Sequence, residues 1–318
     1  MHCMPISSVT VGTRASRLAR WQTEHVIQQL QGAWPGLECH SIAFTTRGDI
    51  TPARPLHEIA GEGVFSLELE KAILSGEIDL AVHSLKDLPI ETATGLVLGA
   101  ILNRTDARDT LVADNGWTLH TLPTGARVGT SSLRRSAQVR AARPDLEIQP
   151  IRGNVETRVR KVEQGEYEAA ILAAAGLQRL GLVHAVTEWL SLDVMMPAPG
   201  QGALAVQCRA TPSAALELLA AIDDPHARAA TTAERAFLQG LGGGCGAPVG
   251  AYAKAEIRTL RPQIRITGLI AALDGSQVVR VEDTGSDAYH LGTQLAQKAL
   301  TQGAGPLLSH HPSKAAIY

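Results

Sequence analysis

One cysteine of this 318-residue chain, Cys245, lies in a glycine-rich run that reads LGGGCGAP over residues 241–248. Glycine on both sides lets the backbone approach other groups closely and adopt left-handed dihedrals, so the sulfur can be presented at the tip of a loop. A sulfur held in this way suits a covalently attached group. The alternative is a small hydrophobic residue in an ordinary loop, because free cysteines are commonly buried and unreactive. The loop alone leaves both interpretations open.

A second candidate is the charged pair Lys86 and Asp87. Residues 78–83 have the pattern of a buried strand that stops at Ser84, so both side chains fall in the turn beyond its carboxyl end, where open parallel sheets bind ligands. A carboxylate there can stabilise a cation that develops on a bound substrate, and this interaction is stronger in a water-poor cleft than in bulk water. Aspartate is also common in turns, and Asp87 comes just before Leu88-Pro89, so its position alone does not distinguish a catalytic carboxylate from a turn residue.

Arginine strongly outnumbers lysine: of the 29 basic residues, six are Lys and 23 are Arg. The planar guanidinium group binds carboxylates through two parallel hydrogen bonds, which lysine cannot form. Several arginines follow predicted strands at points where helices begin, and helix N-termini also attract anions. A ligand with many carboxylates would need such a set, although a single arginine of this kind is usually a solvated surface residue. The set comprises Arg14, with Ser16 beside it, Arg134, Arg135, Arg152 and Arg158.

Alternating strands and helices must position these residues. In the first part of the chain we expect strands at residues 8–11, 39–45 and 78–83, a helix that starts near Leu18 and stops at Pro35-Gly36, and a helix over 64–75. In the second part we expect strands at residues 127–129, 146–151 and 168–173, and helices from the capping hydroxyls of 130–132 to Ala142, over 155–164 and over 177–180. This alternation predicts an α/β fold with a doubly wound sheet in each of two lobes.

The last part of the chain has a different pattern. A helix over residues 227–238 leads into the glycine loop of Cys245. Two strands at 264–273 and 277–282 are joined by Asp274-Gly275-Ser276, which is typical of a hairpin turn, and a final helix covers about 289–303. We therefore expect a third, small α+β domain.

Length and composition restrict the class of protein. A chain of this length suggests two or three domains, and its 45% hydrophobic and 19% charged residues are those of a soluble globular protein. The net charge of −2 argues against nucleic-acid or membrane binding, and the sequence contains neither an 18-residue apolar span nor a signal peptide. The four cysteines have no spacing typical of zinc sites or disulfide frameworks. We expect a cytoplasmic protein without a bound metal.

Six sequence motifs, in this order along the chain, closely resemble those of the porphobilinogen deaminase (hydroxymethylbilane synthase) family. The resemblance covers residues 10–253 and becomes weaker beyond them. It implies two lobes similar to those of periplasmic binding proteins, with chain crossings near residues 103–107 and 197–201. The implied domains are 1–103 with 201–221, 104–200, and 222–318. The motifs are RGD at 47–49, VHSLKDLP at 82–89, GTSSLRR at 129–135, IRGN at 151–154, PGQGA at 199–203 and the cysteine loop.

The resemblance also implies an activity. Members of this family join four porphobilinogen molecules head to tail into hydroxymethylbilane and release ammonia, in tetrapyrrole biosynthesis. By this resemblance Cys245 carries a dipyrromethane cofactor through a thioether, as a primer. Asp87 interacts with pyrrole N–H groups and stabilises the cation left when ammonia departs, and Lys86 contacts carboxylates and modulates Asp87. The expected partner is the small-molecule substrate alone, and the expected state is a monomer.

Further residues match binding positions of the family. The resemblance makes His83 a structural residue at a strand end, and Phe65 either an aromatic residue over the site or part of a helix core. Glu58 and Glu62 depart from the family pattern, because many members have lysines there in a loop that covers the site. The expected cofactor-binding residues are Cys245, Arg134, Arg135, Ser132, Ser131, Thr130, Arg104, Asp49 and Arg152. The expected substrate-binding residues are Arg14, Ser16, Arg158, Arg179, Phe65 and Gln201.

Two other classes of function were considered. A solute-binding protein for small anions would also have two lobes with hydroxyl-lined helix N-termini, but it leaves Cys245 without a purpose. A thiol enzyme that acts by acyl transfer would need a base beside Cys245, and the sequence offers none nearby.

Overall fold

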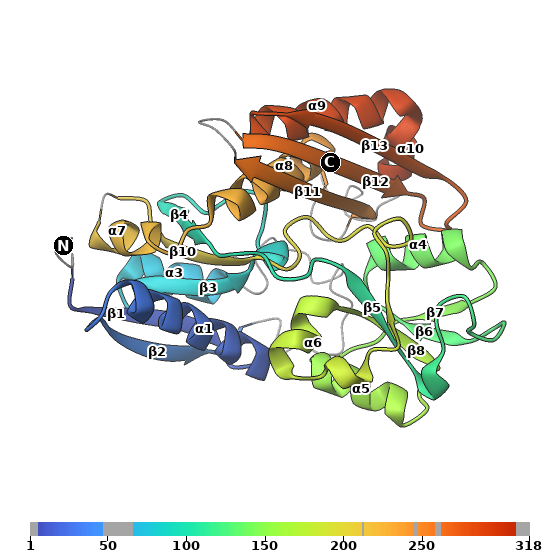
Figure 1. Ribbon diagram of the computed structural model, residues 1–318, viewed down its shortest axis with the longest axis horizontal. Helices are drawn as coiled ribbons and strands as arrows, with labels where there is room; N and C mark the ends of the chain where they lie inside the picture. The colour runs from blue at the N-terminus through green and yellow to red at the C-terminus, as the bar shows by residue number, and fades with distance from the viewer. Residues whose placement is uncertain (1–5, 47–65, 212, 244–246, 258–261, 310–318) are drawn as a thin grey trace, which may run out of the picture.

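The computed structural model describes residues 6–46, 66–211, 213–243, 247–257 and 262–309. The described chain forms three sheets with helices packed against them (Figure 1). Two of the sheets have five strands, and the third has three. This arrangement confirms the predicted α/β class with two lobes and a small α+β unit.

The first lobe has the strand order β2-β1-β3-β10-β4. Strand β1 pairs in parallel with β2 and β3, whereas β10 is antiparallel to both β3 and β4. Helix α1 begins at its N-cap Ser16, whose hydroxyl accepts a hydrogen bond from the Ala19 N–H. The elements are β1 (Ser8–Arg14), α1 (Arg17–Ala33), β2 (Glu38–Phe44), α3 (Leu67–Ser75), β3 (Leu80–Ser84), the short 3₁₀ helix η1 (Leu85–Asp87), β4 (Leu96–Ile101), β10 (Leu204–Arg209) and α7 (Ala214–Ala220).

The second lobe repeats this pattern with the order β7-β6-β8-β5-β9. The chain leaves the first sheet after β4 and enters the second as β5, which is antiparallel to β8; it returns after β9 and enters the first as the antiparallel β10. Each sheet therefore contains one strand that follows directly on a crossing. The elements are β5 (Asp109–Ala113), η2 (Asp114–Gly116), β6 (Arg127–Gly129), α4 (Leu133–Ala142), β7 (Glu147–Gln149), α5 (Val155–Glu163), β8 (Ala169–Ala173), α6 (Ala174–Leu180), η3 (Val183–Ala185) and β9 (Glu188–Trp189).

The third unit is an antiparallel sheet, β11-β12-β13, with α8 and α9 packed together against it (Figure 1). Its core centres on the fully buried Phe237, whose ring occupies the space that a Cβ at Gly268 would need. A larger residue at that position would have to displace the ring. The elements are α8 (Pro225–Gly240), β11 (Val249–Ile257), β12 (Pro262–Ala271), β13 (Val278–Gly285), α9 (Ala288–Ala299), a single π-helical turn (Leu300–Ala304) and α10 (Gly305–Ser309).

Several sequence predictions need correction. Strands β4, β5, β9, β10 and β11 and helices α7 and α10 were not predicted from the sequence. The last predicted helix ends early, because the turn at 300–304 and the left-handed Gly303 interrupt it. The strand expected at 146–151 covers only 147–149, and the part of the helix expected at 64–65 lies outside the described residues. The domain boundaries stay a prediction.

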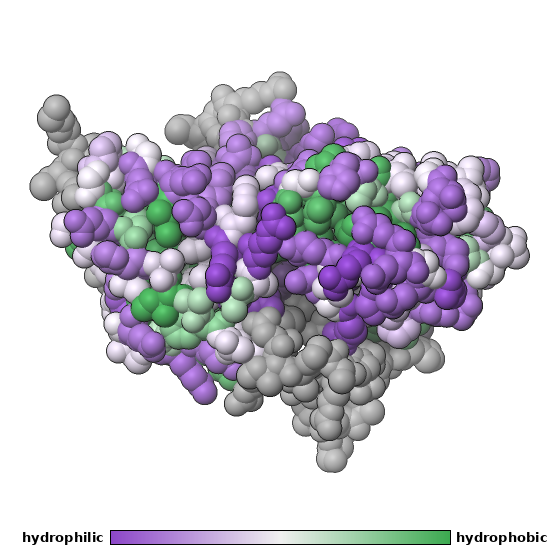
Figure 2. Space-filling model, turned by 90° about the horizontal axis from the view of Figure 1, so that it is seen from below, coloured by the Kyte–Doolittle hydropathy of each residue, from purple (hydrophilic) through white to green (hydrophobic). Residues whose placement is uncertain are grey.

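Hydrophilic side chains predominate on the face seen in Figure 2, and hydrophobic ones gather there in separate patches. No helix within the described ranges is both long and apolar enough to cross a membrane.

Candidate active site

The turn that carries Lys86 and Asp87 follows β3 directly, as the sequence predicts. Leu85 anchors it, because its side chain is fully buried and its N–H donates to the Ala203 carbonyl (3.1 Å). Glycine is required at position 200, where φ is +76° and a Cβ would contact the Leu85 side chain at 2.9 Å. The turn leaves Lys86 half-buried and Asp87 exposed.

Gln201 links this turn to the second lobe. Lys86 Nζ donates to Gln201 Oε1 (3.2 Å), and Gln201 Nε2 donates to Asp109 Oδ1 (2.9 Å) and to the Ala107 carbonyl (2.7 Å). Burial lowers the pKa of Lys86 to about 8; the carboxylates of Asp87 and Asp109 oppose this shift, and the nearby arginines add to it. Gln201 was predicted to bind substrate, but the structure shows it fully buried and hydrogen-bonded within the protein.

Asp109 is the anion at the centre of the site, and the sequence analysis did not identify it. Arg134 Nη1 donates to its Oδ2 (2.8 Å), while Arg135 Nε and Nη2 donate to its Oδ1 (3.1 and 2.6 Å). Burial by itself raises the pKa of Asp109, but the two guanidinium groups outweigh burial and hold the pKa well below its usual range. The partners lie 25 and 26 positions away, so no local sequence signal points to this residue.

Both arginines donate to backbone carbonyls as well. Arg134 Nη1 bonds to the Met196 oxygen (2.6 Å), and Arg135 Nη1 bonds to the Ile171 oxygen (2.9 Å). The sequence placed these arginines at the open start of a helix, whereas the structure buries them. The helix start itself is as predicted, since Ser132 is the N-cap of α4 and accepts from the Arg135 N–H.

The hydroxyls expected to bind cofactor form hydrogen bonds within the protein at or beside this helix start. Thr130 Oγ1 accepts from the Ser132 N–H (3.2 Å), and Ser131 Oγ donates to the Ile151 carbonyl (2.8 Å). Ser131 and Ser132 are half-buried, and Thr130 is buried. The three residues thus lie at the edge of the second sheet from which Arg135 enters the site.

Arg152 and Arg158 extend the positive charge toward Asp87. Asn154 caps α5 by accepting from the Thr157 N–H (2.9 Å), and Arg158 Nε donates to the Gly153 carbonyl (2.9 Å). Burial, together with the charges of Arg135 and Arg152, lowers the pKa of Arg158 to about 10, and the carboxylate of Asp87 opposes this shift. Electrostatic interactions with Lys86 or with Arg158 therefore link five cationic side chains and two carboxylates: Lys86, Arg134, Arg135, Arg152 and Arg158 with Asp87 and Asp109.

Arg14 and His83 lie at the ends of neighbouring strands in the first sheet. Burial lowers the pKa of His83 to about 4; Gln207 opposes the shift, and the charge of Arg14 adds to it. The ring is therefore neutral at pH 7. Ser16, predicted to bind substrate, serves as the N-cap of α1 two residues after Arg14.

Arg104 and Arg179 lie where the chain crosses between the lobes. Arg104 forms a two-pronged ion pair with Glu234 of α8 (2.5 and 3.1 Å), and its Nε donates to the Gln201 carbonyl (2.8 Å). Arg179 Nη2 donates to the Gly202 carbonyl (2.8 Å), and burial lowers the pKa of Arg179 to about 10. Glu234 is a second buried carboxylate that the sequence analysis missed, because its partners are distant in sequence.

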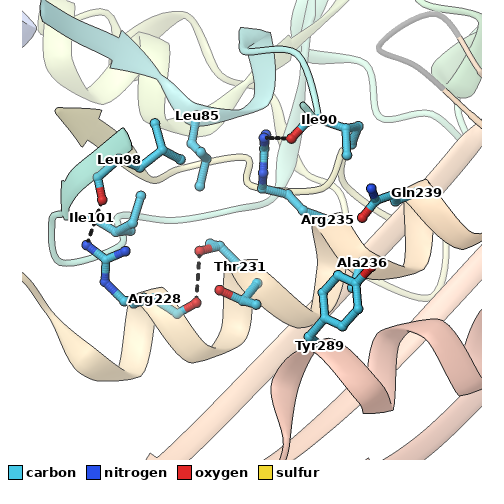
Figure 3. A pocket seen from close by; sticks show the side chains of 11 residues that line it. Leu85, Ile90, Leu98, Ile101, Arg228, Thr231, Arg235, Ala236, Gln239 and Tyr289 are labelled. Atoms are coloured by element: carbon cyan, nitrogen blue, oxygen red, sulfur yellow. Dashed lines mark hydrogen bonds between the residues drawn. The ribbon is translucent and has the colours of Figure 1, made fainter. Parts of the chain in front are cut away.

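A separate cavity of about 170 Å³ lies behind the Lys86–Asp87 turn, between the first lobe and α8 and α9 (Figure 3). Arg235 on its wall donates to the carbonyls of Pro89 (2.6 Å) and Ile90 (2.9 Å) and so supports the chain just after Asp87. Leu85 lines this cavity, whereas Lys86, Asp87, Asp109 and the site arginines do not. Its lining comprises Leu85, Ile90, Leu98, Ile101, Arg228, Thr231, Thr232, Arg235, Ala236, Gln239 and Tyr289.

Some predicted site residues lie outside the described residues. They are Cys245, Asp49 and Phe65, together with Glu58 and Glu62. Within the described ranges, no group of three or more His, Cys, Asp and Glu side chains could hold a metal ion.

The sequence matches two family models. "Porphobilinogen deaminase, dipyromethane cofactor binding domain" matches residues 9–217, and "Porphobilinogen deaminase, C-terminal domain" matches residues 229–301. The chain belongs to the porphobilinogen deaminase family. The resemblance stated from the sequence motifs is thereby confirmed, and the family's first domain is a dipyrromethane-cofactor binding domain.

Curated porphobilinogen deaminases match nearly the whole chain. The protein of Roseiflexus castenholzii is 50% identical over 95% of this chain and 99% of its own length. That of Moorella thermoacetica is 47% identical over 98% of both chains. Among solved structures, the methionine-binding protein MetQ is 13% identical with a TM-score of 0.42, covering 70% of this chain and 92% of that chain. The two curated porphobilinogen deaminases favour that function over a solute-binding protein or an acyl-transfer thiol enzyme.

Proposed function

We propose that this chain is a hydroxymethylbilane synthase, which joins four porphobilinogen molecules head to tail, releases ammonia with each addition, and then frees the linear tetrapyrrole by hydrolysis. The observation that supports this most directly is the excess of cationic side chains around Asp87. Each porphobilinogen carries an acetate and a propionate group, so every addition brings two more carboxylates into the site. Arginine is the side chain best suited to bind them.

Asp87 is the proposed catalytic carboxylate. Asp87 is exposed and is the last residue of the turn. The buried side chain of Leu85 and the hydrogen bond from Lys86 to Gln201 hold the rest of the turn in place, so the carboxylate is presented from a rigid support. When ammonia leaves the substrate, positive charge develops on the pyrrole, and a fixed carboxylate stabilises that charge without reorganising. Lys86 beside it contacts substrate carboxylates and influences the charge on Asp87.

The cofactor would be a dipyrromethane attached to Cys245 through a thioether. The residues fit such a group: its carboxylates require cations, Arg152 and Arg158 are half-buried, and the charges of Arg152 and Asp87 both act on Arg158. When bound, it supplies the pyrrole to which new units are added. The further proposed cofactor residues are Arg134, Arg135, Arg104, Asp49 and the hydroxyls of 130–132. The further proposed substrate residues are Arg14, Ser16, Arg179 and Phe65, whereas the fully buried Gln201 is proposed to act on substrate only through Lys86.

Mass spectrometry of the protein purified from cells tests this function. The intact holoprotein should exceed its encoded mass by two pyrrole units, the excess should lie on the peptide that contains Cys245, and the protein should convert porphobilinogen into hydroxymethylbilane. An unmodified protein with full activity would overturn the cofactor assignment. A modified protein that does not consume porphobilinogen would overturn the proposed reaction.

The remaining sequence predictions accompany this function as proposals. The domains are 1–103 with 201–221, 104–200, and 222–318; the protein is a cytoplasmic monomer. Light scattering on the eluting holoprotein measures the oligomeric state, and a mass of twice 33.6 kDa would overturn the monomer.

A further inference from the structure

Asp109 is the first residue of β5, immediately after the chain crosses into the second lobe. It is fully buried, with 0% of its surface exposed. Its two oxygens accept hydrogen bonds from three side chains, Arg134, Arg135 and Gln201, at distances between 2.6 and 3.1 Å. Four donor nitrogens from α4 and from the returning crossing therefore converge on one carboxylate.

We propose that Asp109 is a positioning residue for the transfer reaction: through Gln201 it holds the ammonium group of Lys86, and through direct ion pairs it holds Arg134 and Arg135. One carboxylate of the second lobe thereby sets where the catalytic turn of the first lobe lies relative to α4. The inference rests on the proposed function above. It assigns a role to a residue that makes no contact with substrate itself.

The amide of Gln201 shows how this link works. Its Nε2 has two N–H groups, and two acceptors face them, Asp109 Oδ1 (2.9 Å) and the Ala107 carbonyl (2.7 Å). Because both acceptors lie on the nitrogen side, the oxygen must point the other way, toward Lys86 Nζ (3.2 Å). The Gln201 carbonyl is also fixed, since it accepts from Arg104 Nε (2.8 Å). Asp109 and the Ala107 carbonyl together therefore fix the orientation of the acceptor that binds Lys86.

Charge gives a second reason why this position requires a carboxylate. The charged groups that act on Lys86 are Asp87, Asp109, Arg134 and Arg135. Without Asp109, three cations would remain together with only the exposed Asp87 to balance them. Mutual repulsion in a poorly solvated site would push Lys86 and the arginines apart. The ammonium form of Lys86 would also be less favourable, so its pKa would fall below about 8.

Three variants test this proposal on the cofactor-loaded holoenzyme. Asp109→Asn removes the charge, and Asp109→Glu restores it one methylene away. Gln201→Leu removes the connection between Asp109 and Lys86, together with the bond to the Ala107 carbonyl, while both arginine pairs remain. The matched control is Asp106→Asn, in the same crossing segment, because Asp106 pairs with Arg108 and not with the cluster. For each protein, kcat, KM and the pH profile of kcat are measured with porphobilinogen.

We expect kcat to fall roughly 10²-fold in Asp109→Asn and at least about 10-fold in Gln201→Leu, because small displacements of reacting groups carry costs of this order. The alkaline limb of the kcat profile should move to lower pH in Asp109→Asn, since Lys86 then loses its proton more easily. In Asp109→Glu the alkaline limb should lie between those of Asp109→Asn and the wild type. The control should match the wild type.

If Asp109→Asn does not fold, the kcat and pH profile of Gln201→Leu test the proposal alone. Wild-type kcat and an unchanged pH profile in Gln201→Leu would overturn the proposal, as would an unshifted alkaline limb in a folded Asp109→Asn protein. A wild-type holoenzyme that makes no hydroxymethylbilane would instead refute the proposed function, so the two failures are distinguishable.

Discussion

Replacement of Glu234 by Gln should destabilise the junction of the three units. Glu234 is fully buried on α8; its Oε1 accepts from Arg104 Nη1 and the Ala253 N–H, and its Oε2 accepts from Arg104 Nη2 and the Gly200 N–H. These donors belong to both crossings and to β11. Glutamine has the same size, but one of its two terminal atoms is an NH₂ group, which cannot accept a hydrogen bond.

The structure sets the expected magnitude. Whichever oxygen of Glu234 is replaced, two of the four hydrogen bonds become contacts between donors. Arg104, with only 11% of its side chain exposed, also loses its anion. Removal of one partner from a buried ion pair costs about 3–5 kcal/mol in the free energy of unfolding. That is a large share of the roughly 5–15 kcal/mol by which a folded domain is stable.

Urea unfolding followed by far-ultraviolet circular dichroism measures this change. The control is Glu217→Gln on α7, where the exposed side chain should alter the free energy of unfolding by no more than about 0.5 kcal/mol. Equal unfolding midpoints for Glu234→Gln and this control would refute the reasoning, because the buried carboxylate would then contribute nothing beyond its shape.

Three more outcomes follow from the site. Asp87→Asn, loaded with preformed tetrapyrrole, should bind porphobilinogen but lose roughly 10²-fold or more in kcat, with enzyme-bound intermediates visible by mass; turnover at the wild-type rate would contradict its role. Arg135→Leu should unfold more easily, because Asp109 loses a buried partner. Arg152→Leu should keep its thermal stability but lose chain elongation, and Arg152→Lys should restore only part of the elongation activity. Equal melting temperatures for the two Leu variants would contradict this. The pKa of His83 is about 4 in the folded protein and 6.5 in the unfolded chain, so the unfolded state binds more protons between these values. The free energy of unfolding should therefore fall by on the order of 3 kcal/mol as pH drops through that window. Unfolding measured from pH 7 to 4 should show a smaller loss in His83→Gln, and identical pH slopes for the two proteins would exclude the histidine as the cause.

Local features of the site could be predicted because they depend on residues close together in the chain. A buried apolar run ending at Ser84 places Asp87 just beyond a strand, and the hydroxyl of Ser132 identifies the start of α4. Gly165 and Gly181 end their helices in the left-handed conformation that glycine tolerates best. These outcomes need only backbone preferences and hydrogen bonds between near neighbours, and the family motifs lie in these same segments.

The missed strands show where such reasoning stops. Strand β10 lies between β3 and β4 only because the chain returns from the second lobe to the first, and β5 enters the second sheet in the same way. An antiparallel strand inserted between parallel neighbours depends on how the whole chain is routed. Its own six residues contain no record of that route.

The sequence by itself determined the α/β class, the family, and the edge of the sheet at which Lys86 and Asp87 lie. Only the tertiary structure decided that Arg134 and Arg135 turn inward onto Asp109 and that Arg104 pairs with Glu234, 130 positions away. A single acidic residue such as Asp109 on β5 or Glu234 on α8 has the same local sequence pattern whether its side chain is solvated or buried. The physical reason is that a buried charge is tolerated only with a partner, and which partner is within reach depends on the packing of the lobes.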